Sequence, residues 1–417
     1  MEFFSYKNDQ LFVESLPMSD IAHKFDTPLY IYSRGALEKN FQRYRKSLQD
    51  WPHLICYAVK ANSNLAVLSI LARQGAGFDI VSVGELERVL AAGGDPSNVV
   101  FSGVGKKYSE IKRALEVGIH CFNIESEAEL ERVQRIANEI HTIAPVSLRV
   151  NPDVDAKTHP YISTGLKANK FGVDINHASD LYQKAFTMPS IKIVGVGCHI
   201  GSQMISKKPI LDALDRLLLL IDSLESKGIK IQHIDIGGGL GVCYKNETPP
   251  STEEYLEEVL ERLKGRDLKL LVEPGRSIAA QAGVLLTKVE LIKITDHKAF
   301  AIVDAAMNDQ LRPSIYGAWH DIVPVNRSYK RENEITYDIV GPICETADFL
   351  GKDRSLNVKE NDLLAIRSAG AYGFSMSSNY NSRNRPAEVI VDKDQAHLVR
   401  RRETIDEQIA PEMLLPS

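Results

Sequence analysis

Short apolar runs alternate with longer segments of helical periodicity between about residues 54 and 274. The apolar runs have the length of buried strands, and the segments between them repeat apolar residues at helical spacing. The predicted strands are 55–59, 78–81, 99–102, 121–124, 146–150, 193–199, 233–236 and 270–273, and the predicted helices include 64–74, 84–92, 109–117, 126–140, 209–227 and 252–264. Eight strand-then-helix units of this length predict a (β/α)8 barrel of the TIM type, an α/β fold.

The pattern changes after residue 282, where Gly and Pro separate β-rich runs and helical periodicity is weak. Further strands are expected at 11–13, 29–32, 284–294, 299–304, 335–340, 362–368 and 388–391. Because the barrel begins at its own first strand, the N-terminal piece is expected to join the C-terminal part of the chain. The sequence therefore predicts a barrel over 33–281 and a mostly β domain, resembling a sandwich or barrel, over 1–32 plus 282–417.

Composition and charge narrow the function classes. The chain has 417 residues, 44% hydrophobic and 25% charged, with a formal net charge of -5. This balance lacks the basic footprint of a nucleic-acid binder, and the short runs 106–107 and 400–402 are interpreted as solvated surface. The apolar run 217–221 is too short to span a bilayer, so no membrane association is expected.

The cysteines and the first residues favour a cytoplasmic protein. Five cysteines are present, an odd number, and no pair has CxxC spacing. A chain of this length does not need disulfides, so reduced thiols are expected, and no metal site is predicted. The N-terminal residues show no charged segment followed by an apolar one, so no signal peptide is expected.

Polar residues follow several predicted strands, at the barrel face where TIM-type active sites lie. Lys60 closes the first strand and Asp79 ends the second, while His199 ends the sixth. Alone, Lys60 is better explained as a surface lysine, and His199 as a hydrogen-bonded core histidine. At a barrel mouth, however, a partly desolvated lysine has a lowered pKa and suits covalent bonding to an aldehyde.

The seventh and eighth strands end in segments suited to anions and to a basic ring. Residues 237–241 hold four glycines in five positions, which lets backbone N–H groups approach an anion closely. The eighth strand ends in EPGR at 273–276, so that Glu273 could pair with a protonated ring nitrogen and Arg276 with an anion. The strand ends together suit pyridoxal 5′-phosphate (PLP), which carries an aldehyde, a phosphate and a basic aromatic nitrogen.

The chain resembles the fold-type III, alanine-racemase-like PLP decarboxylases over nearly its whole length. The motifs that carry this resemblance are YAVKAN at 57–62, CHIGSQ at 198–203, GGG at 237–239, EPGR at 273–276, GPICE at 341–345 and AYG at 371–373. Within the family, the similarity is greatest to the members that act on diaminopimelate, and residues 164–172 also resemble that group.

The resemblance implies roles for individual residues. Lys60 would hold PLP covalently, His199 would stack on its ring and Glu273 would pair with its ring nitrogen. The remaining cofactor-binding residues would be Asp79, Ser202, Gly238, Gly275, Arg276 and Tyr372. Cys344 would come from the partner subunit of a homodimer and return a proton to the substrate carbon, so that two subunits share each active site.

The expected substrate is an amino acid that carries both a carboxylate and an ammonium group at its far end. In the diaminopimelate group, the resemblance implies that Arg276, Arg312 and Tyr316 bind the far carboxylate, and that Glu345 binds the far ammonium. Tyr372 is expected at the same site. The implied reaction converts meso-2,6-diaminopimelate into L-lysine and CO2, the last step of lysine biosynthesis.

Three alternatives stay open at this point. A decarboxylase of ornithine or another basic amino acid has the same fold and is the closest competitor. An amino-acid racemase is disfavoured by Glu273, because racemases of this family usually place Arg at the ring nitrogen. A non-catalytic PLP-binding homologue is disfavoured because such proteins tend to lose the lysine, the cysteine or the β domain, and this chain keeps all three.

Overall fold

The computed structural model describes residues 3–155, 170–328 and 335–416, and the chain divides into two compact units. The barrel unit comprises 38–243 and 247–277. The β unit comprises 1–37, 244–246 and 278–417. Helix α2 (Arg34–Leu48) and helix α10 (Arg276–Ala279) cross from one unit into the other.

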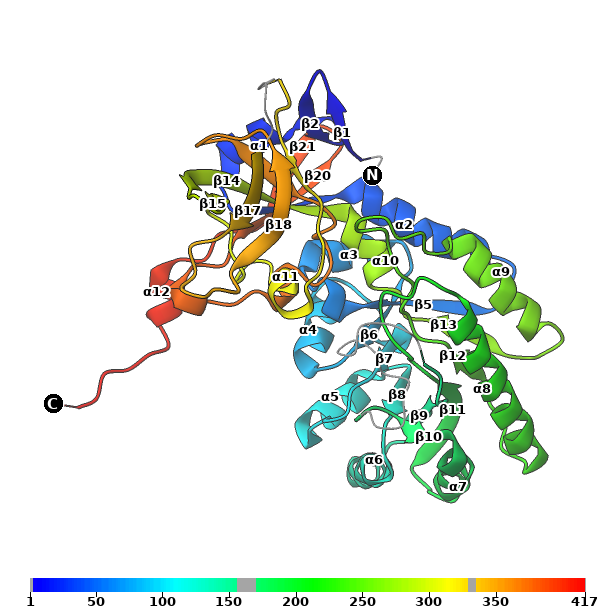
Figure 1. Cartoon of the computed structure of the whole chain (residues 1–417). Coiled ribbons are helices and arrows are strands. Elements are labelled where there is room, and N and C mark those ends of the chain that lie inside the picture. The colour runs from blue at the N-terminus through cyan, green and yellow to red at the C-terminus, as the bar shows by residue number, and fades with distance from the viewer. Residues whose placement is uncertain (1–2, 156–169, 329–334, 417) are drawn as a thin grey trace. The chain divides into compact units, whose positions relative to one another are not determined.

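The barrel unit is built on eight parallel strands that close into a ring (Figure 1). In ring order they are β5 (His53–Ala58), β6 (Gly77–Ile80), β7 (Val99–Phe101), β8 (Cys121–Ile124), β9 (Ala144–Asn151), β11 (Ile191–Gly197), β12 (His233–Asp235) and β13 (Lys269–Val272). The pairings of β8 with β9 and of β13 with β5 complete the ring, and β10 (Val173–Asp174) adds to β9. The predicted (β/α)8 barrel is confirmed.

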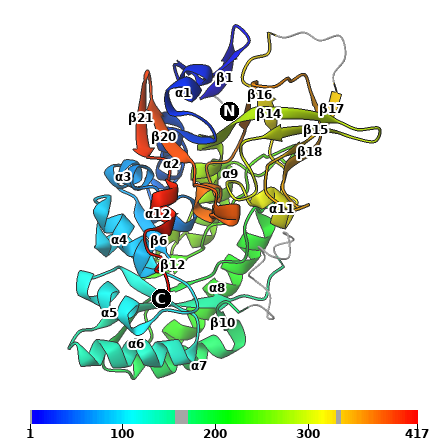
Figure 2. The same ribbon diagram turned by 90° about the vertical axis from the view of Figure 1, so that its left-hand side faces the viewer.

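Helices cover the outside of this ring (Figures 1 and 2). They are α3 (Leu65–Arg73), α4 (Val83–Ala91), α5 (Tyr108–Val117), α6 (Glu127–Glu139), α7 (Ile175–Phe186), α8 (Lys208–Ser226) and α9 (Thr252–Leu263). Each presents an apolar stripe; α8, for example, buries Leu214, Leu217 and Ile221 at spacings of three and four residues. Side chains fix several helix starts, as where Ser126 Oγ accepts a hydrogen bond from the backbone N–H of Glu129.

The β unit has one large sheet with the order β18-β17-β15-β14-β4-β20-β21. The bounds are β4 (Leu29–Ser33), β14 (Gly283–Ile294), β15 (Ala299–Val303), β17 (Ile335–Val340), β18 (Phe349–Leu356), β20 (Ala387–Asp392) and β21 (Gln395–Arg400). Strand β19 (Leu363–Ile366) pairs with both β14 and β16 (Ile322–Pro324). As predicted, the N-terminal segment joins the C-terminal strands: β4 runs antiparallel to β14 and parallel to β20.

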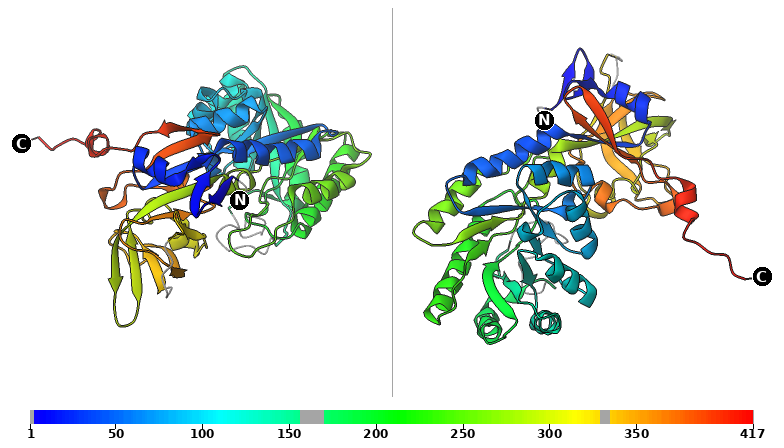
Figure 3. Two further views of the ribbon diagram at one scale, coloured as in Figure 1. Left: turned by 90° about the horizontal axis from the view of Figure 1, so that it is seen from above. Right: turned by 180° about the vertical axis from the view of Figure 1, so that it is seen from behind.

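Smaller elements complete the β unit. A three-stranded sheet holds β1 (Phe4–Lys7), β2 (Gln10–Val13) and β3 (Leu16–Pro17), and the helices are α1 (Met18–Phe25), α11 (Arg312–Tyr316) and α12 (Ile405–Ile409). Its core packs the buried side chains of Ile31, Val284, Leu286 and Val389 against one another. Strands β14 and β15 form a long hairpin, and the chain after α12 ends in an extended tail (Figure 3). Within the described residues, no helix is long and apolar enough to cross a membrane.

Candidate active site

A cavity of about 350 Å³ opens at the C-terminal ends of the barrel strands. Its size falls in the range of small-molecule sites in proteins. The lining residues are Lys60, Val81, Ser102, Gly103, Val104, Asn123, Arg149, Phe171, Gly197, Cys198, His199, Asp235 and Glu273. The barrel therefore brings Lys60, His199 and Glu273, from the first, sixth and eighth strand ends, to one cavity.

Lys60 lies in a single 3-10 turn, Val59–Ala61, directly after β5. Its Nζ is 2.5 Å from Oδ2 of Asp79, a fully buried residue at the end of the neighbouring strand β6. The lysine side chain itself keeps 35% exposure, so its amine lies at the border between the barrel interior and the cavity. Asp79 Oδ1 has no hydrogen-bond partner among the described residues, which leaves a buried acceptor beside the amine.

Two more buried carboxyls stand at the ends of β12 and β13. Asn123 Nδ2 donates to Glu273 Oε1 at 3.3 Å, and the Gly237 N–H donates to Asp235 Oδ1 at 2.8 Å. Burial, followed by the negative charges of Asp235 and Asp79, raises the pKa of Glu273 well above its ordinary value. Burial likewise raises the pKa of Asp235 to about 6. Asp235 and Glu273 therefore tend to be protonated while the cavity holds no cation. A cation or a protonated basic nitrogen placed against them would instead stabilise their charged forms.

His199 is oriented by the glycine loop. The N–H of Gly238 donates to His199 Nδ1 at 3.2 Å, so this nitrogen is the acceptor and carries no proton. Burial lowers the pKa of His199 well below its ordinary value, and the positive charges of Arg149 and Lys60 lower it further. His199 therefore presents a neutral ring to the cavity.

The glycine loop, residues 237–241, has a backbone conformation and packing that side chains would obstruct. A Cβ on Gly238 would lie 2.2 Å from the carbonyl oxygen of Glu273, and Gly237 and Gly239 have φ of 67° and 99°. At the next strand end, Arg276 Nη2 donates to Ser202 Oγ at 2.9 Å. A Cβ on Gly275 would lie 3.0 Å from the Cβ of Ala58. The backbone is therefore closely packed at these strand ends. The buried guanidinium of Arg276 and the hydroxyl of Ser202 together offer the hydrogen-bond donors that an anion site requires.

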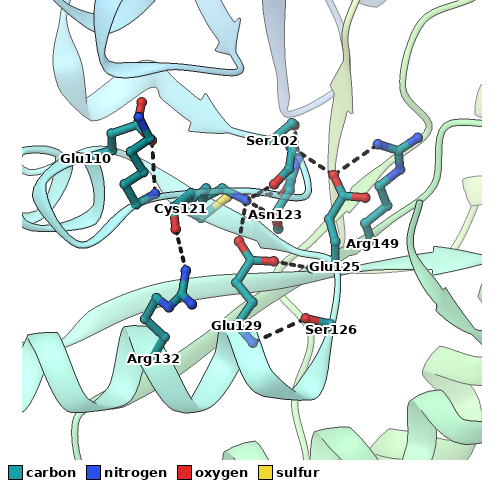
Figure 4. A network of polar contacts seen from close by, with 12 residues as sticks. Ser102, Glu110, Cys121, Asn123, Glu125, Ser126, Glu129, Arg132 and Arg149 are labelled. Atoms are coloured by element: carbon teal, nitrogen blue, oxygen red, sulfur yellow. Dashed lines mark hydrogen bonds and ion pairs between the residues drawn. The ribbon is translucent and has the colours of Figure 1, made fainter. Parts of the chain in front are cut away.

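Asn123 and Arg149 of the cavity wall were not predicted, nor was Glu125, which contacts Arg149. Asn123 and Glu125 lie at the end of β8, and Arg149 lies in β9 (Figure 4). Glu125 accepts from Arg149 at 3.2 Å and from the backbone N–H groups of Gly103 and Gly172, and Arg149 also donates to the carbonyl of His199. A polar residue within an otherwise apolar predicted strand was the available signal for Asn123, and a charged residue within a predicted strand was the signal for Arg149.

The interpretation of Lys106 as solvated surface is wrong. Its side chain is 1% exposed and its Nζ bonds to Glu129 Oε1 at 2.6 Å and to the carbonyls of Gly103 and Asn123. Charge pattern alone could not distinguish it from Lys107, which is exposed. The ion pair instead ties the loop after β7 to helix α6.

The β unit holds the other predicted residues. Arg312, at the start of α11, is buried, and its guanidinium lies 4.7 Å from the Tyr244 ring centre. His320 Nδ1 donates to a backbone carbonyl at 2.9 Å, so its Nε2 accepts from both Arg312 and Gln310. Tyr316, the last residue of α11, is partly exposed.

Cys344 and Glu345 are exposed on a loop between β17 and β18. The Cys344 N–H donates to Asn381 Oδ1 at 2.9 Å, and Tyr380 OH donates to Glu345 Oε1 at 2.5 Å. Tyr372 is partly exposed and has φ of 56°. Of the segment 164–172, residues 164–169 lie outside the described part of the chain.

Comparison with known proteins defines the class. The family model described as "Pyridoxal-dependent decarboxylase, pyridoxal binding domain" matches residues 34–280. The chain belongs to this family of pyridoxal-dependent decarboxylases.

Relatives named diaminopimelate decarboxylase match the whole chain. The protein from Pseudomonas aeruginosa is 61% identical and that from Vibrio cholerae 59% identical, each over 100% of both chains. A solved structure of diaminopimelate decarboxylase from Helicobacter pylori, complexed with L-lysine, has a TM-score of 0.91 and 41% identity, covering 94% of this chain and 98% of that one. The M. jannaschii enzyme in complex with L-lysine has a TM-score of 0.95 and 37% identity, covering 100% and 98%.

The residues of the cavity fit a pyridoxal cofactor. Asp79 and Asp235 each leave one buried carboxylate oxygen without a partner in the described structure. A Cβ on Gly238 would lie 2.2 Å from the carbonyl oxygen of Glu273, so only glycine lets these two strand ends pack this closely at the cavity. Buried acceptors, a lysine amine and an uncovered backbone loop in one place are what a cationic ring, an aldehyde and a phosphate need.

Proposed function

We propose that this chain decarboxylates meso-2,6-diaminopimelate to L-lysine and CO2 with PLP as cofactor, the last step of lysine biosynthesis. The full-length similarity to relatives named diaminopimelate decarboxylase carries this proposal. The buried carboxyls, lysine and glycine loop of the barrel cavity support the cofactor. When bound, PLP withdraws electrons from the substrate carbon that loses CO2.

Lys60 is the residue that holds the cofactor covalently. Its amine is partly exposed to the cavity and 2.5 Å from Asp79, which keeps it oriented across the strand ends. An amine at this position would also be placed to accept or donate a proton beside the bound cofactor. Asp79, as the fixed counter-charge, positions the amine at that step.

Glu273 and His199 control the ring of the cofactor. Glu273 sits in a buried carboxyl cluster in which extra negative charge is unfavourable, so a protonated ring nitrogen opposite it relieves that cost. The neutral ring of His199, which is partly exposed at the cavity, suits stacking on an aromatic face. Keeping the ring nitrogen protonated favours decarboxylation.

The phosphate is assigned to the backbone at Gly238 and Gly275, with Ser202, Arg276 and Tyr372. Ser202 and Arg276 already bond to each other, so an anion between them would receive donors from both. Backbone N–H groups in a glycine loop provide further donors without Cβ obstruction.

A homodimer is part of the proposal, with Cys344 of one subunit serving the cavity of the other. Cys344 and Glu345 are exposed in the single chain, which supports their meeting a second surface. In this assignment Cys344 returns the proton to the carbon that lost CO2. Glu345 binds the far ammonium of the substrate, and Arg276, Arg312, Tyr316 and Tyr372 surround its far carboxylate. The reaction is assigned to the cytoplasm.

A substrate panel tests the proposal. Purified protein with PLP is incubated with meso-diaminopimelate, ornithine, lysine and arginine in turn, and CO2 and amine products are measured. We expect lysine from diaminopimelate and little CO2 from the others, because only diaminopimelate satisfies both a far carboxylate and a far ammonium. Failure to release lysine would refute the assignment, and CO2 mainly from ornithine would favour the competing decarboxylase.

A further inference from the structure

The end of the barrel opposite the cavity holds a cluster of metal-ligand side chains. Cys121 and His233 are the first residues of β8 and β12, and His120 directly precedes β8. Parallel strands start at the same end, so these residues lie at the barrel floor. One ligand atom of each residue lies within 4.8 Å of the others.

Two imidazole nitrogens in this cluster have no partner in the described structure. His120 Nδ1 lies 3.2 Å from the Ser97 carbonyl, so it donates its proton there, and the lone pair remains on Nε2. Nε2 of His120 and Nε2 of His233 are both buried without a hydrogen bond, and His233 is 2% exposed. Buried polar atoms nearly always have a hydrogen-bond partner, so two neighbouring imidazole nitrogens without one point to a ligand between them.

The neighbouring strand leaves room for the His233 ring. A Cβ on Gly195 in β11 would lie 2.0 Å from His233 Nε2. Any other residue at 195 would displace the ring from its present position. The glycine therefore preserves the place of a buried imidazole that makes no hydrogen bond through Nε2.

One cation lies near the cluster. Lys269, the first residue of β13, is partly exposed, so water screens its repulsion of a bound ion.

We propose that His120, Cys121 and His233 form a structural Zn2+ site at the floor of the barrel. Two imidazoles and a thiolate suit this borderline-soft ion, whereas Mg2+ and Ca2+ need oxygen ligands. Binding releases the Cys121 thiol proton to solvent as the Zn–S bond forms, and a water completes the four ligands. Zn–N and Zn–S bonds of about 2.0–2.3 Å require the donors to approach one another by about 1 Å. Half-buried His120 provides the path of entry.

The ion would join strands that do not pair in the sheet. Strands β8 and β12 are separated by β9 and β11 in the ring. A ligand set drawn from both therefore cross-links the starts of these two strands, two residues before Asn123 and Asp235 of the cavity wall. Its expected effect is on stability, independent of which substrate is decarboxylated.

Co2+ substitution gives a direct test, because thiolate-bound tetrahedral Co2+ has a charge-transfer absorbance that hexaaqua Co2+ lacks. Co2+ is titrated into purified holoenzyme, and we expect one equivalent per chain to develop this band and Zn2+ to abolish it. Cys121→Ser should lose the band, whereas Cys243→Ser and Cys344→Ser, both at exposed cysteines, should keep it. Absence of the band, or its persistence in Cys121→Ser, would overturn the proposal.

Thermal unfolding supplies a second readout, with a variant that leaves Cys121 in place. Zn2+ should raise the Tm of the wild-type holoenzyme and leave the Tm of His120→Gln unchanged, because a ligand stabilises only the state that binds it. His120→Gln affects a half-buried ring and should fold, as circular dichroism without metal will verify. An equal Zn2+ effect on both proteins would place binding elsewhere and reject the site.

Discussion

The barrel unit gathers its candidate residues at the ends of paired strands, whereas the β unit leaves two of its own exposed on a loop. Lys60, Asp79 and Glu273 are held by strand ends whose positions the closed ring fixes. Cys344 and Glu345 sit on a surface loop with one side-chain partner each nearby. The difference separates two tasks: a cofactor requires a pre-arranged, desolvated site, but a proton donor and a substrate ligand can be supplied from a surface that becomes enclosed on assembly.

The largest effect is expected at Lys60, in the cavity of the barrel unit. Lys60→Ala should lower kcat by on the order of 10³-fold or more, because it removes the covalent anchor of the cofactor. Absorbance of the protein-bound cofactor should shift to that of free PLP. Lys107→Ala, at an exposed lysine, is the matched control and should behave as wild type. Near-normal turnover in Lys60→Ala would remove this lysine from the mechanism.

The exposed loop of the β unit is tested next. Cys344→Ala should lower kcat by about 10²–10⁴-fold, the usual contribution of a positioned proton donor. PLP binding should be unchanged, because the loop is not assigned to the cofactor. Cys243→Ser changes another exposed cysteine and should retain activity. If both variants turn over equally well, exposure of Cys344 has no catalytic meaning.

A smaller effect, on the affinity for the cofactor, is expected where backbone segments pack closely at the barrel site. Gly238→Ala places a Cβ 2.2 Å from a backbone oxygen that cannot move independently. Overpacking of this kind costs about 1–3 kcal/mol, so the cofactor dissociation constant should rise by roughly 5- to 150-fold. Gly105→Ala is the control, since nothing lies within 4 Å of its added Cβ. Equal PLP affinity in the two variants would show that the loop adapts.

The smallest effect concerns a buried carboxyl of the β unit. Burial raises the pKa of Asp309 from 3.8 to about 7. The folded protein then binds more protons than the unfolded chain between about pH 4 and 7, so the free energy of unfolding falls as pH rises through that window. Asp309→Asn should make this decline shallower by up to about 1.4 kcal/mol per pH unit, as urea unfolding at several pH values will show. The exposed Asp394→Asn should leave the slope unchanged.

Periodicity was sufficient to predict the ring of strands, because each is a short apolar run set between amphipathic helices. It did not predict β21, none of whose residues is buried. Position at the end of a strand predicted cavity residues better than residue type did. It predicted Lys60, His199 and Glu273, which line the cavity. It missed Arg149, because this residue lies one position inside its predicted strand. Burial of Lys106 and the meeting of His120 with His233 depend on contacts between distant strands, which no local pattern encodes.

The position of β4 in the β unit has a consequence for how the protein is made. This strand, complete by residue 33, pairs on one side with residues 283–286 and on the other with residues 387–391. During synthesis, the barrel segment can emerge and fold while β4 waits with both edges unpaired, because its partners leave the ribosome last. The β unit can therefore close only near the end of translation, and a chain released early keeps an open strand able to pair with other molecules.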